Sequence, residues 1–257
     1  MIMSKKGIDV SKYQREIDWG KVKNSGIEFA VIRAGYGRES SQEDPYFKKN
    51  YEGAKAVGLP IGTYWYSYAM SVEEAKLEAS VCLEILKDKG FDLPVYYDVE
   101  EGKQAELGRG TVTDMVLAFS DKIKAAGHQA GVYASANWLK NYLDLSRLDG
   151  LSIWKADYRE DYDKEIFCDI HQYTSQGRVD GIDGNVDLNH GYMELPKPEP
   201  ETKKVDVYYR PSGSDDESAW TSTPPVPKQA GTWELKAVFT YDPVYYEVRN
   251  TQHIDAS

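Results

Sequence analysis

Two carboxylic acids stand at the end of a short apolar segment, residues 93–101, whose sequence is LPVYYDVEE. Its apolar, β-branched and aromatic start predicts a buried strand. Successive strand side chains alternate between faces, so Asp98 and Glu100 point the same way, with Cα atoms about 6.6 Å apart. Hydrolysis of a glycosidic bond uses such a pair, one carboxyl group to donate a proton and one to stay ionised. The alternative is a solvated strand end followed by further acids in a loop.

The composition narrows the classes of function. The chain has 257 residues, enough for one barrel-sized domain and a small appendage. Its formal net charge of −11 argues against a nucleic acid or an anionic membrane as partner. The 20 Tyr and 6 Trp include rings that could cover sugar faces, although most aromatic side chains fill cores. No apolar segment approaches the length of a membrane span.

The reactive side chains that bind metals are scarce. Cys82 and Cys168 lie far apart in the sequence, and we expect two buried free thiols rather than a disulfide. The four His residues are not spaced as metal ligands, and there is no CxxC motif, so we expect no metal and no cofactor.

The first residues lack the apolar stretch of a signal peptide. We therefore expect that such a peptide was trimmed, or that release is of the phage type and does not use one.

Strand-like and helix-like segments alternate along most of the chain. Short apolar segments predict eight strands, over residues 7–11, 29–35, 60–66, 93–101, 130–134, 151–155, 169–173 and 185–189. Helical patterns lie between the earlier strands: one starts at Asp18, one spans 45–57, one is capped by Ser71 in a capping box with Glu74, one starts at Thr111 or Thr113, and one spans 136–143. The alternation predicts parallel strands in an α/β fold, a compact TIM-like (β/α) barrel with reduced helices on the later strands.

The active site of such a barrel lies at the carboxyl ends of its strands. This rule brings four acids to one rim: Asp9, Asp98, Glu100 and Asp187. Acids that converge repel one another and raise at least one pKa, which can keep a carboxylic acid protonated near neutral pH. Other strands carry further candidates at similar places: Arg33, Tyr64, Tyr133, Trp154 and Tyr173.

Three acid-bearing segments occur in an order that resembles glycoside hydrolase family 25, the lysozymes (N-acetylmuramidases) of bacteria, phages and some fungi. They are residues 7–14 (GIDVSKYQ), 98–100 (DVE) and 184–189 (GNVDLN). Residues 29–35 (FAVIRAG) and 172–175 (QYTS) also resemble the family. The likeness covers about residues 6–192 and implies a flattened barrel of about eight strands, in agreement with the strand pattern.

The resemblance implies hydrolysis of the β-1,4 bond between N-acetylmuramic acid and N-acetylglucosamine in peptidoglycan, with its glycan strands as the partner. On the matching positions it makes Glu100 the general acid. Asp98 would orient the substrate acetamido group for attack on the anomeric carbon, or would stabilise positive charge there. Asp9 and Asp187 would be further acids of the same groove that hold Asp98 and the sugar in place.

Substrate-binding positions follow from the same resemblance. It implies aromatic walls of the groove at Tyr64, Tyr133 and Trp154. Arg33 could contact the substrate or serve as a structural counter-ion for the acids, and Tyr173 is a further substrate-binding candidate. Four more aromatic residues could line the groove or fill core: Tyr36, Tyr66, Tyr68 and Trp138.

Three positions depart from the common family pattern. Trp65 stands where His is frequent, His171 stands where Trp often precedes Gln-Tyr, and Asp157 stands where Gln is frequent. None of these departures removes a catalytic acid. They concern subsite contacts and substrate preference, so a hydrolase of another amino-sugar polymer such as chitin stays open. A peptidoglycan-binding protein without turnover is a separate alternative.

The sequence changes character after the eighth strand. A Pro-rich linker, residues 195–204, follows the catalytic barrel, residues 1–194. Alternating segments over residues 205–209, 232–241 and 245–248 predict a small antiparallel β-module, residues 205–257, that is marginal alone. The module could anchor the enzyme to the cell wall, pack on the barrel or space it from another domain. We expect a monomer that acts outside the cell or in the cell wall.

Overall fold

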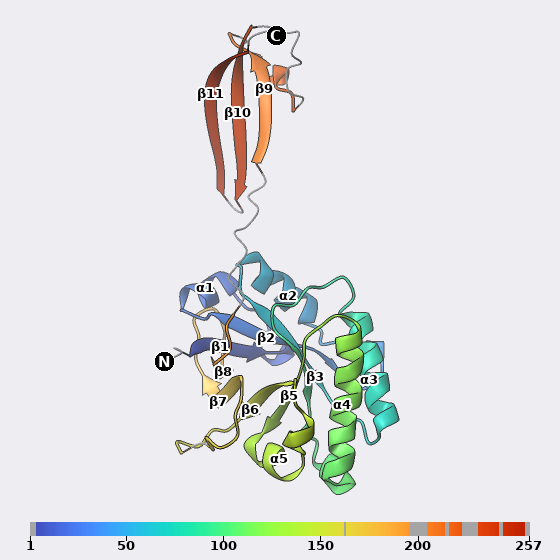
Figure 1. The fold of residues 1–257 in the computed structure, drawn as a ribbon. Coiled ribbons are helices and arrows are strands. Elements are labelled where there is room, and N and C mark those ends of the chain that lie inside the picture. Colours follow the sequence, from blue (N-terminus) through green and yellow to red (C-terminus); the bar gives the residue numbers. More distant parts are fainter. Residues whose placement is uncertain are drawn as a thin grey trace. The chain divides into compact units, whose positions relative to one another are not determined.

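The computed structural model describes residues 4–161, 163–195, 205–213, 216–222, 231–241 and 244–254. The chain divides into two compact units, Met1–Lys197 and Pro198–Ser257. The first unit contains a closed barrel of eight strands that follow one another around it in sequence order (Figure 1). Of the helices in the described ranges, none combines the length and apolar character required to cross a membrane.

The barrel strands are β1 (Lys5–Val10), β2 (Phe29–Tyr36), β3 (Ile61–Tyr66), β4 (Val95–Asp98), β5 (Ala130–Ser135), β6 (Ser152–Ala156), β7 (Ile170–Gly177) and β8 (Val186–Gly191). The α-helices are α1 (Trp19–Asn24), α2 (Phe47–Ala56), α3 (Val72–Ile85), α4 (Arg109–Ala125) and α5 (Ala136–Asn141). Single turns of 3-10 helix lie at Lys12–Gln14, Ser40–Gln42 and Leu145–Arg147, with a longer one at Gly102–Leu107. The predicted α/β barrel with few helices on its later strands is confirmed.

The last strand does not follow the predicted parallel arrangement. Neighbouring strands from β1 to β7 are parallel, whereas β8 is antiparallel to both β7 and β1. Only residues 178–185 connect β7 to β8, and a parallel crossover needs a dozen or more residues. Because β8 runs in reverse, its first residues lie at the rim where the parallel strands end.

Two helix starts differ from the sequence signals. Helix α4 begins at Arg109, and Thr113 lies inside it with Oγ1 donating to the Arg109 carbonyl at 2.7 Å. A threonine can satisfy its hydroxyl in this way within a helix, so it is an ambiguous start signal. Ser71 does cap α3, but Glu74 accepts from the backbone N–H of Met70 at 2.7 Å, so the predicted capping box is only half formed.

Two apolar layers are separated by the barrel wall. The inward-pointing cluster consists of Phe29, Val31, Leu93, Tyr96, Tyr133, Trp154, Ala156 and Ile170. Outward-pointing strand side chains pack with the helices, of which α3 and α4 lie side by side (Figure 1). At Gly7 an added Cβ would lie 2.2 Å from Cζ of Phe29, so only glycine leaves room for this ring. The inner layer fills the barrel beneath its carboxyl-end rim.

Both cysteines are free and buried, as predicted. Cys82 lies on α3, and Cys168 precedes β7. Burial raises the pKa of both thiols, which keeps them protonated and unreactive.

The second unit contains a three-stranded antiparallel sheet in the order β11, β10, β9. Its strands are β9 (Val205–Pro211), β10 (Gly231–Tyr241) and β11 (Val244–Ile254), and a 3-10 turn spans Glu217–Ala219. The guanidinium of Arg210 lies over the Trp220 ring, 4.5 Å from its centre. Most of the predicted linker, residues 196–204, and the predicted turn at 242–243 lie outside the described residues.

Candidate active site

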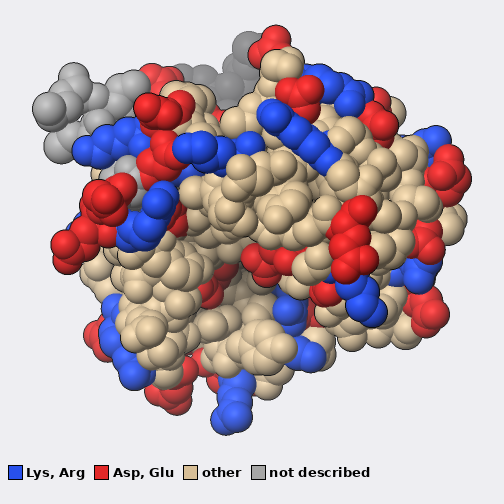
Figure 2. Space-filling model, turned by 90° about the horizontal axis from the view of Figure 1, so that it is seen from below, with Lys and Arg blue, Asp and Glu red and all other residues tan. Residues whose placement is uncertain are grey.

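A cleft of about 570 Å³ opens at the carboxyl ends of the parallel strands. Figure 2 shows a hollow on one face of the molecule with acidic side chains inside it. Eight of the nine site residues expected from the sequence line the cleft: Asp9, Arg33, Tyr64, Asp98, Glu100, Tyr133, Trp154 and Asp187. The structure therefore brings together the four acids from β1, β4, the turn after β4, and β8.

Asp9 lies at the bottom of the cleft with its carboxylate held by two amides. Nε2 of Gln172 and Nδ2 of Asn189 each donate to its Oδ2 at 2.8 Å. Burial and the negative charge of Asp187 raise the pKa of Asp9 well above its ordinary value, while the two amide hydrogen bonds lower it. The amides thus favour the ionised form of a group that its surroundings would otherwise protonate.

The amides that hold Asp9 are themselves oriented by aromatic side chains. Trp154 donates from Nε1 to Oδ1 of Asn189 at 2.8 Å. Oε1 of Gln172 accepts from the hydroxyl groups of Tyr133 at 3.0 Å and Tyr158 at 2.6 Å. Since each amide oxygen is occupied by a donor, each amide nitrogen is left to face Asp9.

The aromatic residues beneath the acids form a packed floor. The Trp154 ring meets Tyr133 edge-on with centres 4.5 Å apart, and it contacts Tyr64 at 5.8 Å and Tyr96 at 5.3 Å. Trp154 is only 1% exposed, so it offers little of its surface to a ligand. Tyr64 is half-buried and Tyr133 buried, which places these three predicted walls closer to the floor of the cleft.

Asp98 ends β4 and is buried. Its Oδ1 has no hydrogen-bond partner among the described residues. Burial raises the pKa of Asp98 well above its ordinary value, as do the charges of Glu100 and Asp9, whereas the positive charge of Arg33 lowers it. An unpaired buried carboxyl oxygen in a cleft is available to a ligand that brings a donor or a positive charge.

Glu100 follows β4 and is exposed at the mouth of the cleft. The cleft walls remove part of its water, and this desolvation, followed by the charges of Asp187 and Glu101, raises the pKa of Glu100. Asp187 is half-buried, and burial raises its pKa to about 6. The cleft therefore holds carboxyl groups that can carry a proton at mildly acidic pH.

Arg33 has a carboxylate partner outside the group of four acids. Its Nε donates to Oδ2 of Asp44 at 2.7 Å, and its Nη2 lies 2.6 Å from the same oxygen. Asp44 also accepts from the backbone N–H groups of Lys12 and Tyr46, at 3.0 and 2.9 Å. Arg33 thus ties the loop after β1 to the cleft wall while its charge acts on Asp98.

Tyr173 lies on the outer face of the barrel, contrary to the expectation from its strand-end position. It stacks on His190 with ring centres 4.3 Å apart and is not among the described residues that line the cleft. The β7–β8 ladder is irregular between Gln172 and Thr174, so alternation alone does not fix the side of Tyr173. Its stacking on His190, the residue after the inward-pointing Asn189, does. The expected sugar contact at Tyr173 therefore has no support from its position.

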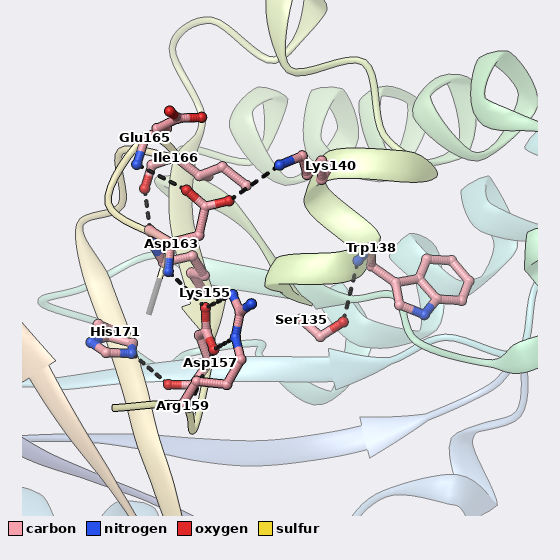
Figure 3. A network of polar contacts seen from close by, with 10 residues as sticks. All are labelled: Ser135, Trp138, Lys140, Lys155, Asp157, Arg159, Asp163, Glu165, Ile166 and His171. Atoms are coloured by element: carbon pink, nitrogen blue, oxygen red, sulfur yellow. Dashed lines mark hydrogen bonds and ion pairs between the residues drawn. The ribbon is translucent and has the colours of Figure 1, made fainter. Parts of the chain in front are cut away.

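The three departures from the family pattern also point away from the cleft. Trp65 is buried on the outer side of β3 and donates from Nε1 to the Gly37 carbonyl at 3.0 Å. Nε2 of His171 lies 2.8 Å from the Asp157 carbonyl, and the Asp157 carboxylate binds Arg159 (Figure 3). None of the three is among the residues that line the cleft.

Several cleft residues were not assigned from the sequence. Gln172 and Asn189 occur in the family-like segments, but their role as amide donors to Asp9 needed the barrel register to be seen. Tyr158 lies in a loop without periodic pattern. Further lining comes from Ser11, Lys12, Tyr13 and Gln14 after β1, and from the three ambiguous tyrosines Tyr36, Tyr66 and Tyr68.

The described part of the chain contains no group of three or more His, Cys, Asp or Glu side chains arranged to hold a metal ion. Of the four cleft acids, Asp9 is instead bound by the two amides. The chemistry that the arrangement offers is proton transfer and charge stabilisation by carboxyl groups.

The chain matches the family model described as "Glycosyl hydrolases family 25" over residues 8–182. An autolytic lysozyme of Clostridium acetobutylicum is 31% identical over 189 residues, which cover 72% of this chain and 55% of that protein. An uncharacterized Escherichia coli protein, YegX, is 32% identical over 192 residues, which cover 71% of this chain and 68% of the relative.

Solved structures show the same barrel. The autolysin LytC of Streptococcus pneumoniae, solved in complex with a synthetic peptidoglycan ligand, has a TM-score of 0.64 and 28% identity, over 73% of this chain and 46% of that one. The spore cortex lytic enzyme SleM of Clostridium perfringens shares the fold over 98% of both chains, with a TM-score of 0.63 and 17% identity. This chain thus spans about half the length of some relatives and nearly all of another. The match to the family model covers residues 8–182, which include most of the barrel described above. This chain therefore belongs to family 25 of the glycosyl hydrolases.

Proposed function

We propose that this enzyme is a lysozyme that hydrolyses the β-1,4 bond between N-acetylmuramic acid and N-acetylglucosamine in peptidoglycan. The observation that carries the proposal is the convergence of Asp9, Asp98, Glu100 and Asp187 in one cleft over an aromatic floor. Peptidoglycan lies outside the cell membrane, so the proposed site of action is the cell wall. The similarity to an autolytic lysozyme supports the substrate class.

Glu100 is the proposed general acid. It is the most exposed of the four acids, so it can reach the oxygen of the bond that breaks, and its raised pKa favours the protonated form. During cleavage its proton passes to the leaving oxygen as the bond from that oxygen to the anomeric carbon breaks. A water oxygen then bonds to the anomeric carbon, and one proton of that water passes to the ionised Glu100 and restores the acid.

Asp98 is the proposed partner at the anomeric centre. Its buried, unpaired Oδ1 can accept a hydrogen bond from the substrate acetamide N–H, which would orient the acetamide oxygen toward the anomeric carbon. Direct stabilisation of the positive charge by the carboxylate is the alternative. Asp9 and Asp187 contribute negative charge that favours a positively charged transition state and a protonated Glu100.

The test is the clearing of purified peptidoglycan suspensions, with mass analysis of the released ends. We expect wild-type enzyme to clear the suspension and to leave N-acetylmuramic acid at the new reducing ends. Glu100→Gln should lose at least about 100-fold in rate, because general-acid catalysis contributes this much. Glu106→Gln, an exposed acid of the next turn, is the matched control and should clear normally.

The same assay separates the alternatives. Clearing with N-acetylglucosamine at the reducing ends would identify a glucosaminidase, and turnover of chitin without clearing would identify another amino-sugar polymer as substrate. Binding to several wall types without any clearing would contradict the lysozyme proposal and leave a glycan-binding protein.

The role of the second unit is a separate proposal. We infer that it either anchors the enzyme on the wall or acts as a spacer, and co-sedimentation with insoluble peptidoglycan distinguishes the two. Residues 1–197 contain a closed barrel with its own core, which supports independent folding. An anchoring role predicts weaker sedimentation of residues 1–197 than of the full chain, whereas a spacer predicts equal sedimentation.

A further inference from the structure

The loop from β6 to β7 carries a buried lysine beneath it. Lys155 is the fourth residue of β6, next to the inward-pointing Trp154, and it points to the outer side of the barrel. It is only 1% exposed. Its ammonium group donates to the carbonyl oxygens of Asp163 and Ile166, the latter at 2.9 Å (Figure 3). A buried charge is costly unless it is bound in this way, so the lysine and the loop hold each other in place.

The first residues of the loop are fixed by a second set of contacts. The Asp157 carboxylate accepts from Nε and Nη2 of Arg159 at 2.8 and 2.6 Å, and from the backbone N–H of Asp163 at 3.0 Å. Both backbone polar groups of Asp157 are hydrogen-bonded to β7. Its N–H donates to the Gln172 carbonyl at 3.0 Å, and its carbonyl lies 2.8 Å from Nε2 of His171. Figure 3 shows these groups gathered around Asp157 and Lys155.

Tyr158 lies between these fixed residues and reaches into the cleft. Its hydroxyl donates to Oε1 of Gln172 at 2.6 Å, and Nε2 of Gln172 donates to Asp9. Tyr158 is 53% exposed as a residue, and it lines the cleft. An exposed ring whose hydroxyl is already tethered presents a fixed apolar face to a bound molecule.

We propose that Tyr158 is a sugar-contact residue of this cleft and that buried Lys155 is its positioning residue. Lys155 acts through the described residues of the loop, 157–161 and 163–169. The described residues of this loop form no helix that could hold it against the barrel. The hydrogen bonds from Lys155 to the Asp163 and Ile166 carbonyls hold it there instead. The inference rests on the proposed carbohydrate substrate. It assigns to β6 a role in substrate binding rather than in bond cleavage.

A double-mutant cycle tests the coupling, with kinetics measured on soluble peptidoglycan strands. Tyr158→Ala should raise KM about tenfold, and Lys155→Met should raise it three- to tenfold. In both variants kcat should stay within about twofold of wild type, because the Tyr133 hydroxyl still donates to Oε1 of Gln172 and keeps the amide turned toward Asp9. In the Tyr158→Ala background, Lys155→Met should have no further effect on KM. Lys124→Met, an exposed lysine on α4, is the matched control and should match wild type.

An effect of Lys155→Met that persists in the Tyr158→Ala background would overturn the proposal, because the lysine would then act by another route. A fall in kcat at unchanged KM would overturn it too. If Lys155→Met does not fold, Arg159→Gln loosens the same loop from an exposed position and should raise KM in the same Tyr158-dependent way.

A readout that needs no turnover separates this inference from the proposed function. A crystal structure of Lys155→Met should show the Tyr158 hydroxyl displaced from Gln172, and binding of N-acetylglucosamine oligomers, followed by tryptophan fluorescence, should weaken. Wild-type enzyme that binds these oligomers without clearing peptidoglycan would contradict the proposed function alone. An unmoved Tyr158, or oligomer binding unchanged in Tyr158→Ala, would contradict the further inference.

Discussion

Asp9 on β1 and Asp187 on β8 are direct partners in the antiparallel ladder that closes the barrel. Side chains at such a pair lie on the same face of a sheet, and like charges placed opposite each other destabilise it. The closure of the barrel thus places repulsion between two acids at the proposed catalytic centre. The predictions below concern this pair, the amides around it and a further buried carboxyl group on α3.

The charge of Asp187 should set the pH range of activity. A general acid works only while protonated, so activity falls as pH rises through the pKa of Glu100. The charge of Asp187 raises that pKa, and Asp187→Asn removes it. The alkaline limb of the rate–pH profile should therefore move to lower pH. Glu101→Gln should produce a smaller shift in the same direction, and a limb that moves to higher pH would contradict the assignment of Glu100.

The acidic cluster should also cost stability at neutral pH. Burial raises the pKa of Asp187 from 3.8 to about 6, so the folded protein holds the Asp187 proton more tightly than the unfolded chain does. This contribution to the free energy of unfolding is fully present below about pH 3.8 and is lost as pH rises through 6. Asp187→Asn should consequently raise Tm at pH 8 by a few degrees, on the order expected for about 1 kcal/mol. At pH 3.5 the two proteins should melt nearly together. Calorimetry at the two pH values checks this difference.

The amide donors should hold the pKa of Asp9 down. Gln172→Ala or Asn189→Ala removes a hydrogen bond to the ionised carboxylate, so the pKa of Asp9 should rise further. Trp154→Phe should cause a smaller rise, because it frees the oxygen of Asn189 and lets the amide turn. Carbon-13 NMR titration of the Asp9 carboxyl group measures each value. Unchanged titration in all three variants would show that the amides do not control this charge.

A further buried carboxyl group, that of Glu78, supports the wall next to Asp98. Glu78 on α3 accepts from the Tyr97 hydroxyl at 2.6 Å and from the Tyr68 backbone N–H at 2.9 Å, and burial raises its pKa to about 7. Tyr97→Phe should destabilise the protein by about 1–3 kcal/mol, because Glu78 and the Ser67 hydroxyl each lose a partner.

Urea denaturation provides the measurement for this variant. Tyr142→Phe, a partly buried tyrosine beside Trp138, is the control and should change the free energy of unfolding by less than about 1 kcal/mol. Equal losses in the two variants would show that the buried network around Glu78 has no special role in stability.

The sequence was sufficient to predict the barrel and to place the four acids on one rim. Strand periodicity located Asp9 and Asp98, and the rule about carboxyl ends of parallel strands grouped them. The position of Asp187 agrees for a different reason, since it lies at the beginning of a reversed strand. Alternation of apolar residues is the same in both directions, so it could not predict that reversal.

The residues that line the cleft walls were harder to predict. Their places depend on which face of a strand each side chain occupies and on the conformation of loops. Tyr173 lies where the β7–β8 ladder is irregular and stacks on His190 on the outer face, which its strand-end position alone does not predict. Tyr158 owes its place to backbone carbonyls bound by Lys155 and to the ion pair of Asp157. Neither contact leaves a periodic pattern in the sequence.

The reversal of β8 has a further consequence for protein engineering. Lys5 at the start of β1 is the ladder partner of Gly191 at the end of β8, so the two ends of the barrel are neighbours. A short Gly-rich linker could join residues 191 and 5, and new termini could be opened in the exposed turn around Asp88 and Lys87, away from the cleft lining. The barrel is thus suited to circular permutation, with its acidic rim left as one uninterrupted surface.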